Sequence, residues 1–160
     1  ACEQAVDLLR AHLPGIRALR DVSVADFARL EHLLPPLAAK RARHVVGECA
    51  RVDEAIGLLD QGDAAGFGRL MFETHASLRD DYQVSIRELD ALVELASNLP
   101  GCWGARLSGA GFGGCTVNLV QQQHAAQFIA RLTEGYLQQT GIQAEIYLCR
   151  ASAGVSVSGQ

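Results

Sequence analysis

The sequence predicts an α+β domain in which helices pack on one face of a small, mostly antiparallel sheet. Residues 2 to about 99 repeat apolar side chains at the spacing of amphipathic helices. Residues 103–120 instead alternate with a period of two on both sides of a glycine-rich loop, and residues 142–149 alternate in the same way after one more helix. Helices first and strands second is the order typical of the α+β class.

Helix boundaries follow from capping and breaking residues. Ser23, followed three residues later by Asp26, and Ser85 are polar residues that cap free backbone N–H groups, while Pro-Gly and Gln-Gly pairs end helices. The expected helices run from 2 to 13 before Pro14-Gly15, from Ser23 to about 33, from Pro36 to Gln61-Gly62, from Asp63 to about Leu78, and from Ser85 to Pro100-Gly101.

The helices 2–13 and 23–33 are amphipathic, and two further helices show an apolar face that can be given residue by residue. In the long helix that starts at Pro36, apolar residues step by four, three, four and three, which predicts one buried face. That face consists of Val45, Cys49, Val52, Ile56 and Leu59. The face of the helix after Ser85 consists of Leu89, Leu92, Val93 and Ala96.

A loop with four glycines in six positions, 109–114, joins two predicted strands. Trp103, Ala105 and Leu107 alternate with polar or small residues before it, and Val117 and Leu119 alternate with Thr116 and Asn118 after it. Glycine takes positive φ freely, so consecutive N–H groups of such a loop can converge on an anion such as phosphate. An ordinary hairpin needs the same residue, and the loop has neither a Gly-Lys-Ser/Thr ending nor the dinucleotide-binding pattern.

The chain ends on an amphipathic helix and a predicted strand. The apolar face of the helix consists of Ala125, Phe128, Ile129, Leu132 and Tyr136. In the strand, Ile142, Ala144, Ile146 and Leu148 face one way, and Gln143, Glu145, Tyr147 and Cys149 face the other. Val155 and Val157 are expected to add a short edge strand.

Composition restricts the class of protein. A chain of 160 residues with 49% hydrophobic composition is expected to form one domain, 1–160, and its charge of −4 indicates no nucleic-acid partner. No apolar run reaches the ~20 residues of a membrane span. Five cysteines at unrelated spacings predict no metal site and no disulfide framework, but reduced, mostly buried thiols in a cytoplasmic protein. The chain starts inside a helical pattern without methionine, so we expect a fragment of a longer protein.

Polar residues outside the loop have mainly structural interpretations. The segment 73–82 combines His75, Ser77 and adjacent carboxylates and could line a cleft, but polar groups at a helix end explain it as well. His44 is expected to be a hydrogen-bonded helix residue, and Ser77 has no base at a readable spacing. We expect Cys115 to be a small core residue. His12, His32 and His124 are expected on the surface, and Arg41, Arg43 and Arg51 on a solvated helix face.

Residues 104–117, Gly-Ala-Arg-Leu-Ser-Gly-Ala-Gly-Phe-Gly-Gly-Cys-Thr-Val, resemble the third conserved motif of galactokinases, which belong to the superfamily of galactokinase, homoserine, mevalonate and phosphomevalonate kinases. The resemblance extends from about residue 2 to 150. The other segments that carry it are Leu19-Arg20-Asp21-Val22-Ser23, His44-Val45-Val46-Gly47-Glu48, Arg51-Val52, Gly62-Asp63, Phe67-Gly68, Leu70-Met71, His75 with Ser77-Leu78, Asp80-Asp81-Tyr82-Gln83-Val84-Ser85 and Glu88-Leu89-Asp90.

The resemblance implies the ferredoxin-like C-terminal domain of an enzyme that transfers the γ-phosphoryl group of Mg-ATP to the anomeric hydroxyl of galactose. It assigns no catalytic residue and no metal ligand to this chain, because the sugar motif, the ATP-phosphate loop and the catalytic base belong to an absent N-terminal domain. The fragment alone is then expected to be inactive. The residues implied to shape the phosphate region are Ser108, Gly109, Ala110, Gly111, Gly113 and Gly114.

Three alternatives stay open at this stage. A galactokinase-like sensor would bind galactose and ATP without turnover, and an N-acetylgalactosamine or arabinose kinase would differ in its sugar. A face that normally packs on an N-terminal domain could also make the isolated chain dimerise. The sequence departs from the family at Ile86-Arg87, where many members have Cys-Pro, and at Thr74, where serine is frequent; both changes concern helix geometry.

Overall fold

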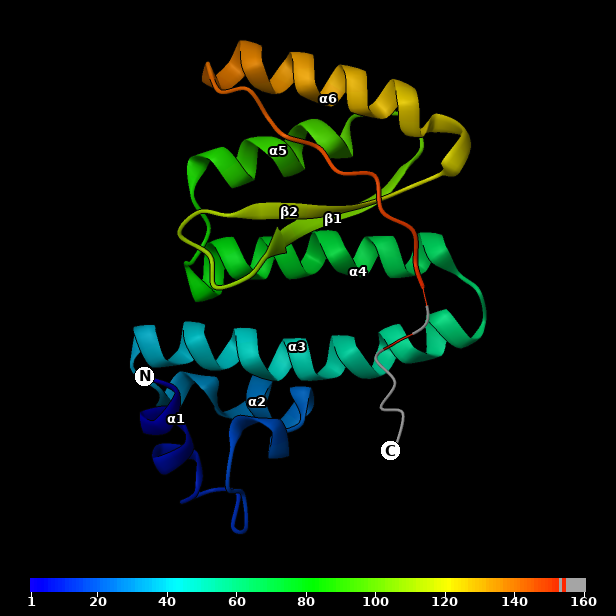
Figure 1. The fold of residues 1–160 in the computed structure, drawn as a ribbon. Helices are drawn as coiled ribbons and strands as arrows, with labels where there is room; N and C mark the ends of the chain where they lie inside the picture. The colour runs from blue at the N-terminus through cyan, green and yellow to red at the C-terminus, as the bar shows by residue number, and fades with distance from the viewer. Residues whose placement is uncertain (153, 155–160) are drawn as a thin grey trace, which may run out of the picture.

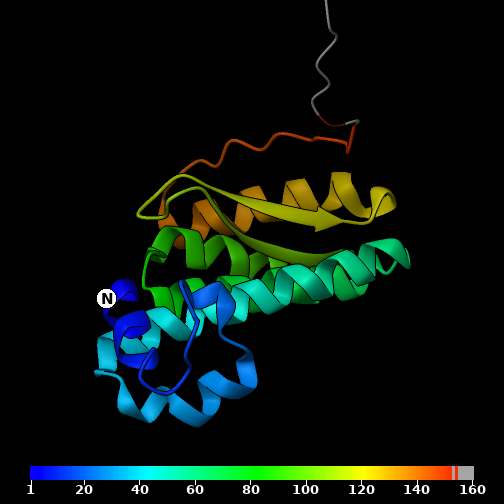
Figure 2. The same cartoon turned by 90° about the horizontal axis from the view of Figure 1, so that it is seen from below.

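The computed structural model describes residues 1–152 and 154. In Figure 1, α6 and α5 lie on one side of the hairpin β1–β2, α4 and α3 lie on the other, and α1 and α2 follow beyond α3. Figure 2 shows from below how α1 and α2 lie against α3. The elements are α1 (Cys2–Leu9), η1 (Leu19–Asp21), α2 (Val24–Leu30), η2 (Glu31–Leu33), α3 (Pro36–Asp60), α4 (Ala64–Ser77), the π-helical turn η3 (Leu78–Tyr82), α5 (Arg87–Ser97), β1 (Cys102–Ser108), β2 (Cys115–Val120), η4 (Gln122–His124) and α6 (Ala125–Thr140).

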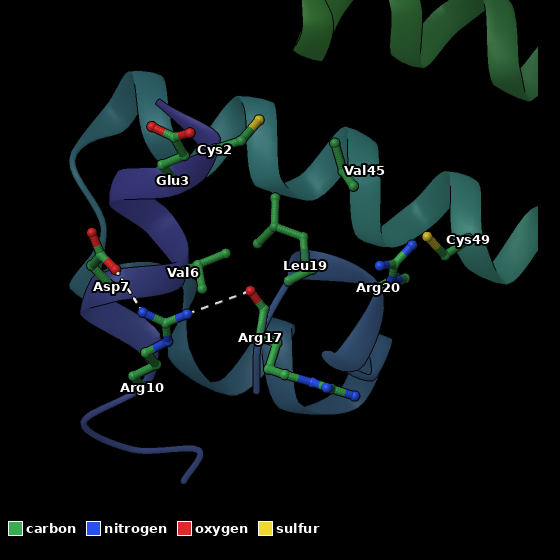
Figure 3. A pocket seen from close by; sticks show the side chains of 11 residues that line it. Cys2, Glu3, Val6, Asp7, Arg10, Arg17, Leu19, Arg20, Val45 and Cys49 are labelled. Atoms are coloured by element: carbon green, nitrogen blue, oxygen red, sulfur yellow. Dashed lines mark hydrogen bonds and ion pairs between the residues drawn. The ribbon is translucent and has the colours of Figure 1, made fainter. Parts of the chain in front are cut away.

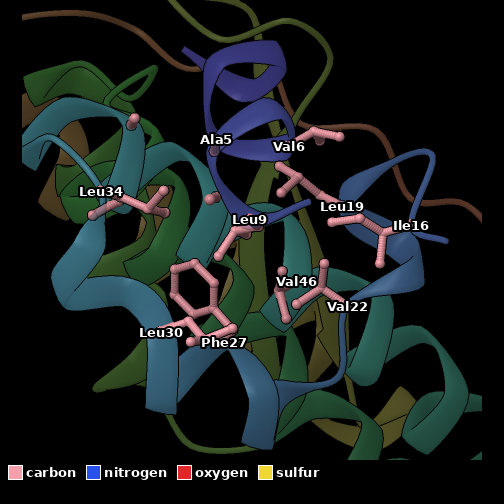
Figure 4. Close-up of a cluster of buried hydrophobic side chains, with 13 residues drawn as sticks. Ala5, Val6, Leu9, Ile16, Leu19, Val22, Phe27, Leu30, Leu34 and Val46 are labelled. Atoms are coloured by element: carbon pink, nitrogen blue, oxygen red, sulfur yellow. The ribbon is translucent and has the colours of Figure 1, made fainter. Parts of the chain in front are cut away.

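A first hydrophobic core holds the N-terminal helices together (Figure 4). Phe27 of α2 and Leu9 of α1 lie at its centre, and Ala38, Ala42 and Val46 of α3 close it from one side. Small alanine side chains leave room for the neighbouring helices, so burial of large side chains is concentrated on α1, η1 and α2. As expected, the Ser23 hydroxyl accepts the Asp26 N–H at 3.0 Å and begins α2.

A second core lies between the hairpin and the helices α5 and α6. Val93 and Ala96 of α5, Ala105 of β1, and Phe128 and Leu132 of α6 are its buried members. The two strands are antiparallel and pair from Cys102–Val120 to Ser108–Cys115, with a register shift between Cys102 and Gly104. Helices that pack with a small antiparallel sheet confirm the predicted α+β class.

Two glycines set the contact between α4 and β1. A Cβ on Gly68 would overlap the carbonyl of Trp103, and a Cβ on Gly104 would overlap the backbone of Gly68. The register shift in β1 falls at this point, where Trp103 is the extra residue. Backbone therefore packs on backbone, which requires glycine on both elements.

Several expectations about the helices need correction. Helix α1 ends at Leu9 rather than at residue 13. Ser85 does not cap α5, whose N-cap residue is Ile86; the Ser85 hydroxyl donates to Asp90 instead. The predicted buried face of α3 is exposed in its second half, with Val52, Ile56 and Leu59 each at least 55% exposed, because the core uses the Ala38–Ala42–Val46 row of the same helix.

The predicted strand 142–149 does not form, and Gly141 to Arg150 have no ladder partner. Ala144 and Ile146 are still half-buried, and Ile146 contacts the second core, so the alternation reflects one covered side without strand pairing. Val155 and Val157 lie outside the described residues. The prediction of mostly buried thiols is also wrong: Cys2, Cys49 and Cys102 are half-buried, and Cys115 and Cys149 are exposed. Cys115 is therefore not a core residue.

The glycine contact yields a first prediction. Gly68→Ala should lower the free energy of unfolding by about 3 kcal/mol or more, because the new methyl group meets backbone that cannot turn away. Gly57→Ala is a matched control in α3, since a Cβ there meets nothing within 4 Å; it should raise stability by up to about 1 kcal/mol. Urea unfolding measures both. Equal stability of the two variants would contradict the proposed backbone contact.

Candidate functional site

The loop between β1 and β2 exposes backbone without side chains. Gly109, Gly111, Gly113 and Gly114 all have positive φ, and a Cβ on Gly109 or Gly113 would meet nothing within 4 Å. These two glycines are therefore required by backbone conformation and not by packing. Consecutive residues of this kind leave the main chain open to an approaching anion.

One side of the loop is fixed against the segment between η3 and α5. The Phe112 N–H donates to the Val84 carbonyl at 2.7 Å, and a Cβ on Gly111 would overlap the same carbonyl. Phe112 itself has φ 58° and is 73% exposed. Gln83, beside Val84, has φ 59°, and among the described residues these two are the non-glycines with positive φ. The loop is more than an ordinary hairpin connection, because a second segment determines its path.

A buried histidine connects α4, β1 and α5. The Nδ1 of His75 accepts the Leu107 N–H at 3.3 Å, and Nε2 lies 3.1 Å from Oδ1 of Asp90. The same oxygen accepts the Ser85 hydroxyl at 2.6 Å. His75 is 3% exposed, so its ring is shielded from solvent, whereas the Asp90 side chain is 31% exposed and Ser85 is half-buried. It satisfies a backbone group of β1 rather than of its own helix end, which refines the structural interpretation of segment 73–82.

The hydrogen bonds determine the protonation of His75. Because Nδ1 accepts a backbone N–H, the ring proton resides on Nε2 and is donated to Asp90. Burial lowers the pKa of His75, while the Asp90 carboxylate opposes this shift. The imidazole is therefore neutral at neutral pH and serves as an acceptor for β1 and a donor for α5.

A second histidine has a similar environment between α3 and α4. His44 is 7% exposed, its Nδ1 lies 3.0 Å from the Ser77 hydroxyl, and its ring stacks on Tyr82 with centroids 4.5 Å apart. The expectation of a hydrogen-bonded helix histidine is confirmed. Ser77 does have an imidazole partner, 33 residues away, which no local spacing could indicate. Burial lowers the pKa of His44.

The arginines of α3 are not simply solvated. Arg43 binds Glu31 at 3.1 Å and Asp81 at 2.7 Å, and Arg51 binds Glu48 at 2.6 Å. Arg41 donates to the Asp81 carbonyl and, at 3.1 Å, to Gln83. The Arg41 and Arg43 bonds join α3 to η2 and to residues 81–83, whereas the Arg51–Glu48 pair lies within α3. Arg43 is exposed as predicted, but all three arginines have protein partners, so the face is not simply solvated. His12 and His32 are exposed as expected, whereas His124 is half-buried.

The structure keeps the six sequence-predicted loop residues together. Ser108 ends β1 opposite Cys115 and is half-buried, as is Gly113. Gly109, Ala110 and Gly114 are exposed, and Gly111 lies against Val84. Sequence reasoning missed Phe112, Val84 and the Ser85–Asp90–His75 connection. The sequence could have pointed to Phe112, because a large apolar residue stands among the glycines of the loop. It could not have pointed to the Val84 carbonyl, because every residue has a backbone carbonyl.

Neither of two surface cavities includes a loop residue. One, of about 530 Å³, lies between α1, η1 and α3 (Figure 3); Val6, Leu19 and Val45 form its apolar wall, and Arg10 is held by Asp7 at 3.0 Å. The other, of about 380 Å³, lies between α2, α3 and α4. In the described part of the chain no three His, Cys, Asp or Glu side chains are placed to hold a metal ion. None of the described helices combines the length and apolarity of a membrane span.

Comparison with known proteins places this geometry in a family context. A model of the family described as GHMP kinases C terminal matches residues 55–138. The galactokinase of Roseiflexus sp. (strain RS-1) is 53% identical over 154 residues, which are 96% of this chain and 39% of that protein. The galactokinase of Chloroflexus aurantiacus is 50% identical over 155 residues, 97% of this chain and 40% of that protein.

A solved structure agrees with these relatives. The crystal structure of Lactococcus lactis galactokinase complexed with galactose matches with a TM-score of 0.86 and 35% identity, and the match covers 91% of this chain and 38% of that one. The chain therefore spans about two fifths of the length of the relatives it matches.

The two buried histidines predict a loss of stability in mild acid. Their pKa values are lowered on folding, so the unfolded chain binds more protons once the pH falls below the ordinary histidine pKa of about 6.5. The free energy of unfolding should be flat above that pH and fall below it, by up to about 1.4 kcal/mol per pH unit for each histidine.

Urea unfolding between pH 7.5 and 5 measures this slope. His44→Gln should reduce it, because one of the two titrating groups is gone, whereas His12→Gln should leave it unchanged, since His12 is exposed. The carboxyls with lowered pKa, such as Asp21 and Asp80, lose their contribution to the free energy of unfolding only below about pH 4. They therefore do not affect the slope measured between pH 7.5 and 5. Constant stability down to pH 5 would contradict the prediction.

Proposed function

The chain belongs to the GHMP kinases, through their C-terminal domain, and from this premise we propose that it is the C-terminal domain of a galactokinase. The complete protein would transfer the γ-phosphoryl group of ATP to the anomeric hydroxyl of galactose, giving galactose 1-phosphate and ADP. The observation that carries the proposal is the glycine loop 109–114, whose open backbone lies within a chain that matches galactokinases over nearly its full length.

The proposed role of the loop is to contribute to the phosphate region. Phosphoryl transfer depends on positioning and on stabilising the negative charge of the phosphate oxygens. A backbone with positive φ at Gly109, Gly111, Gly113 and Gly114 suits this task, because N–H groups approach an anion closely where no Cβ intervenes. Ser108 and Ala110 complete the proposed set. We assign no catalytic base to this chain.

The remaining parts of the reaction belong to the rest of the proposed protein. We propose that ATP arrives as Mg-ATP and that an N-terminal domain supplies the sugar site, the other phosphate loop and the base. Among the described residues no three His, Cys, Asp or Glu side chains are placed to hold a metal ion, and we assign no magnesium ligand to this chain. An ATP-dependent reaction of this kind is expected in the cytoplasm. Dimerisation of the isolated chain stays a prediction.

ADP release with Mg-ATP and galactose tests the proposal, on this chain and on a version extended upstream to the natural start of the gene product. Turnover by the extended version alone is the expected result. N-acetylgalactosamine and arabinose serve as alternative substrates, and faster turnover of either would reassign the sugar. Binding of galactose and ATP without ADP release would indicate a sensor, and turnover by the 160-residue chain would show that the machinery lies within it.

A pair of glycine variants tests whether the loop contributes to the phosphate region. Gly109→Ala and Gly15→Ala introduce the same methyl group at φ +92° and +99°, and neither meets an atom within 4 Å. Each should therefore cost stability by a similar amount, about 1–2 kcal/mol. In the extended protein only Gly109→Ala should reduce kcat/KM for ATP, on the order of tenfold to a hundredfold. Equal kinetic effects, or none, would exclude the loop from the phosphate region.

A further inference from the structure

The glycine loop needs anchors outside its own sequence. Glycine-rich segments lose the most conformational freedom on folding, so a loop with four glycines in six positions does not hold one shape by itself. The structure provides two attachments, one at each side of the loop's first half. Leu107, just before the loop, donates its N–H to His75, and Phe112, within the loop, donates its N–H to Val84.

Both attachments lead to one carboxylate oxygen. Oδ1 of Asp90 accepts the Nε2 proton of His75, whose Nδ1 holds Leu107. The same Oδ1 accepts the hydroxyl of Ser85, the residue next to Val84. A displacement of Asp90 would therefore weaken both attachments together, although β1 stays paired with β2 and the Val84 N–H still donates to the Leu78 carbonyl at 3.0 Å.

We propose that His75, Asp90 and Ser85 are positioning residues that hold the glycine loop in its phosphate-accepting shape through this shared oxygen. The identity of the ligand rests on the proposed galactokinase function, but the positioning itself does not. Two features support the proposal. Phe112 and Gln83 have left-handed backbone, which is unfavourable for non-glycine residues, and the Phe112–Val84 bond lies between them. The hydroxyl–carboxylate bond of 2.6 Å is a charge-assisted one, among the stronger kinds in proteins.

Protonation of His75 would undo one attachment. A proton on Nδ1 would oppose the Leu107 N–H, so β1 would lose its acceptor. The charged groups near His75 are Asp90 on α5 and, in η3, Arg79 and Asp80, which pair with each other at 2.8 Å. The Arg79–Asp80 pair leaves Asp90 as the charge in direct contact with the ring. The neutral imidazole, with its proton on Nε2, is thus the form that keeps the loop attached.

Amide hydrogen exchange of the 160-residue chain, followed by NMR, tests the positioning without any ligand. Ser85→Ala should speed exchange of the Phe112 amide about tenfold, and Asp90→Ala should speed exchange at both Phe112 and Leu107. His75→Gln should act mainly on Leu107. Each change is divided by the change at Leu132, a buried residue of α6, which reports global unfolding. The ¹⁵N shifts of the His75 ring should show a proton on Nε2 at pH 7.

Ser77→Ala is the matched control. It also removes a half-buried hydroxyl that bonds a buried histidine, His44, but that pair has no bond to the loop. In Ser77→Ala the exchange rate of the Phe112 amide, divided by that of Leu132, should equal the wild-type value. Asp90→Asn should keep part of the protection, since its amide oxygen still accepts. Unchanged Phe112 exchange in both Ser85→Ala and Asp90→Ala, or an Nδ1 proton on His75, would overturn the proposal.

A kinetic readout connects the positioning to function in the extended protein. Ser85→Ala should lower kcat or raise KM for ATP by about tenfold and leave KM for galactose within about twofold, because a displaced loop affects phosphate contacts selectively. Ser77→Ala should change neither. If the Phe112 amide exchanges faster in Ser85→Ala but kcat and KM for ATP do not change, the positioning has no effect on catalysis. That result would overturn the proposed link between positioning and phosphate binding. An extended protein without kinase activity would refute the galactokinase proposal while the exchange result stands.

Discussion

The contact between Gly68 and Gly104 determines how the two halves of the fold meet. Because neither residue has a side chain, α4 lies with its backbone against β1, at the point where Trp103 interrupts the strand register. His75 follows Gly68 by seven residues, which is about 10 Å along a helix at about 1.5 Å per residue. Leu107 follows Gly104 by three, also about 10 Å along a strand at about 3.3 Å per residue. The glycine contact thus brings His75 level with the Leu107 N–H.

Helix α4 uses different chemistry on its other side. Toward α3 it presents Thr74 and Ser77, whose hydroxyls bond Glu48 and His44 at 3.0 Å. Apolar surfaces of similar shape can slide, whereas hydroxyl, carboxylate and imidazole groups bond only in one register. This polar contact therefore fixes α4 along α3, and the glycine contact fixes it along β1. The N-terminal core and the hairpin core share no member, and they are held together through this helix and through the bonds of Arg41 and Arg43 to Asp81 in η3.

Hydrophobic periodicity in the sequence was sufficient for the element order, but not for the partner of each apolar face. In α3 the chain carries two apolar rows, and the conspicuous one, with Val52 and Ile56, is exposed, while the row of Ala38 and Ala42 is buried. Small residues gave a weak signal although they allow the closest packing. The period of two around Ile146 likewise indicated a covered side correctly. Strand pairing also needs backbone hydrogen bonds to a neighbouring strand, and no local pattern reports whether these form.

At the candidate site, too, the sequence does not reveal which contact a given glycine makes. Its glycines look alike in sequence, yet Gly111 is required by contact with Val84, and Gly109 by its backbone conformation in open space. Only the fold separates these causes, because Val84 is more than 20 residues away in the chain. The loop sequence permits many shapes, and the connection between α4 and α5 selects one through the Phe112–Val84 bond. The geometry offered to an anion is therefore a property of how α4, α5 and β1 pack.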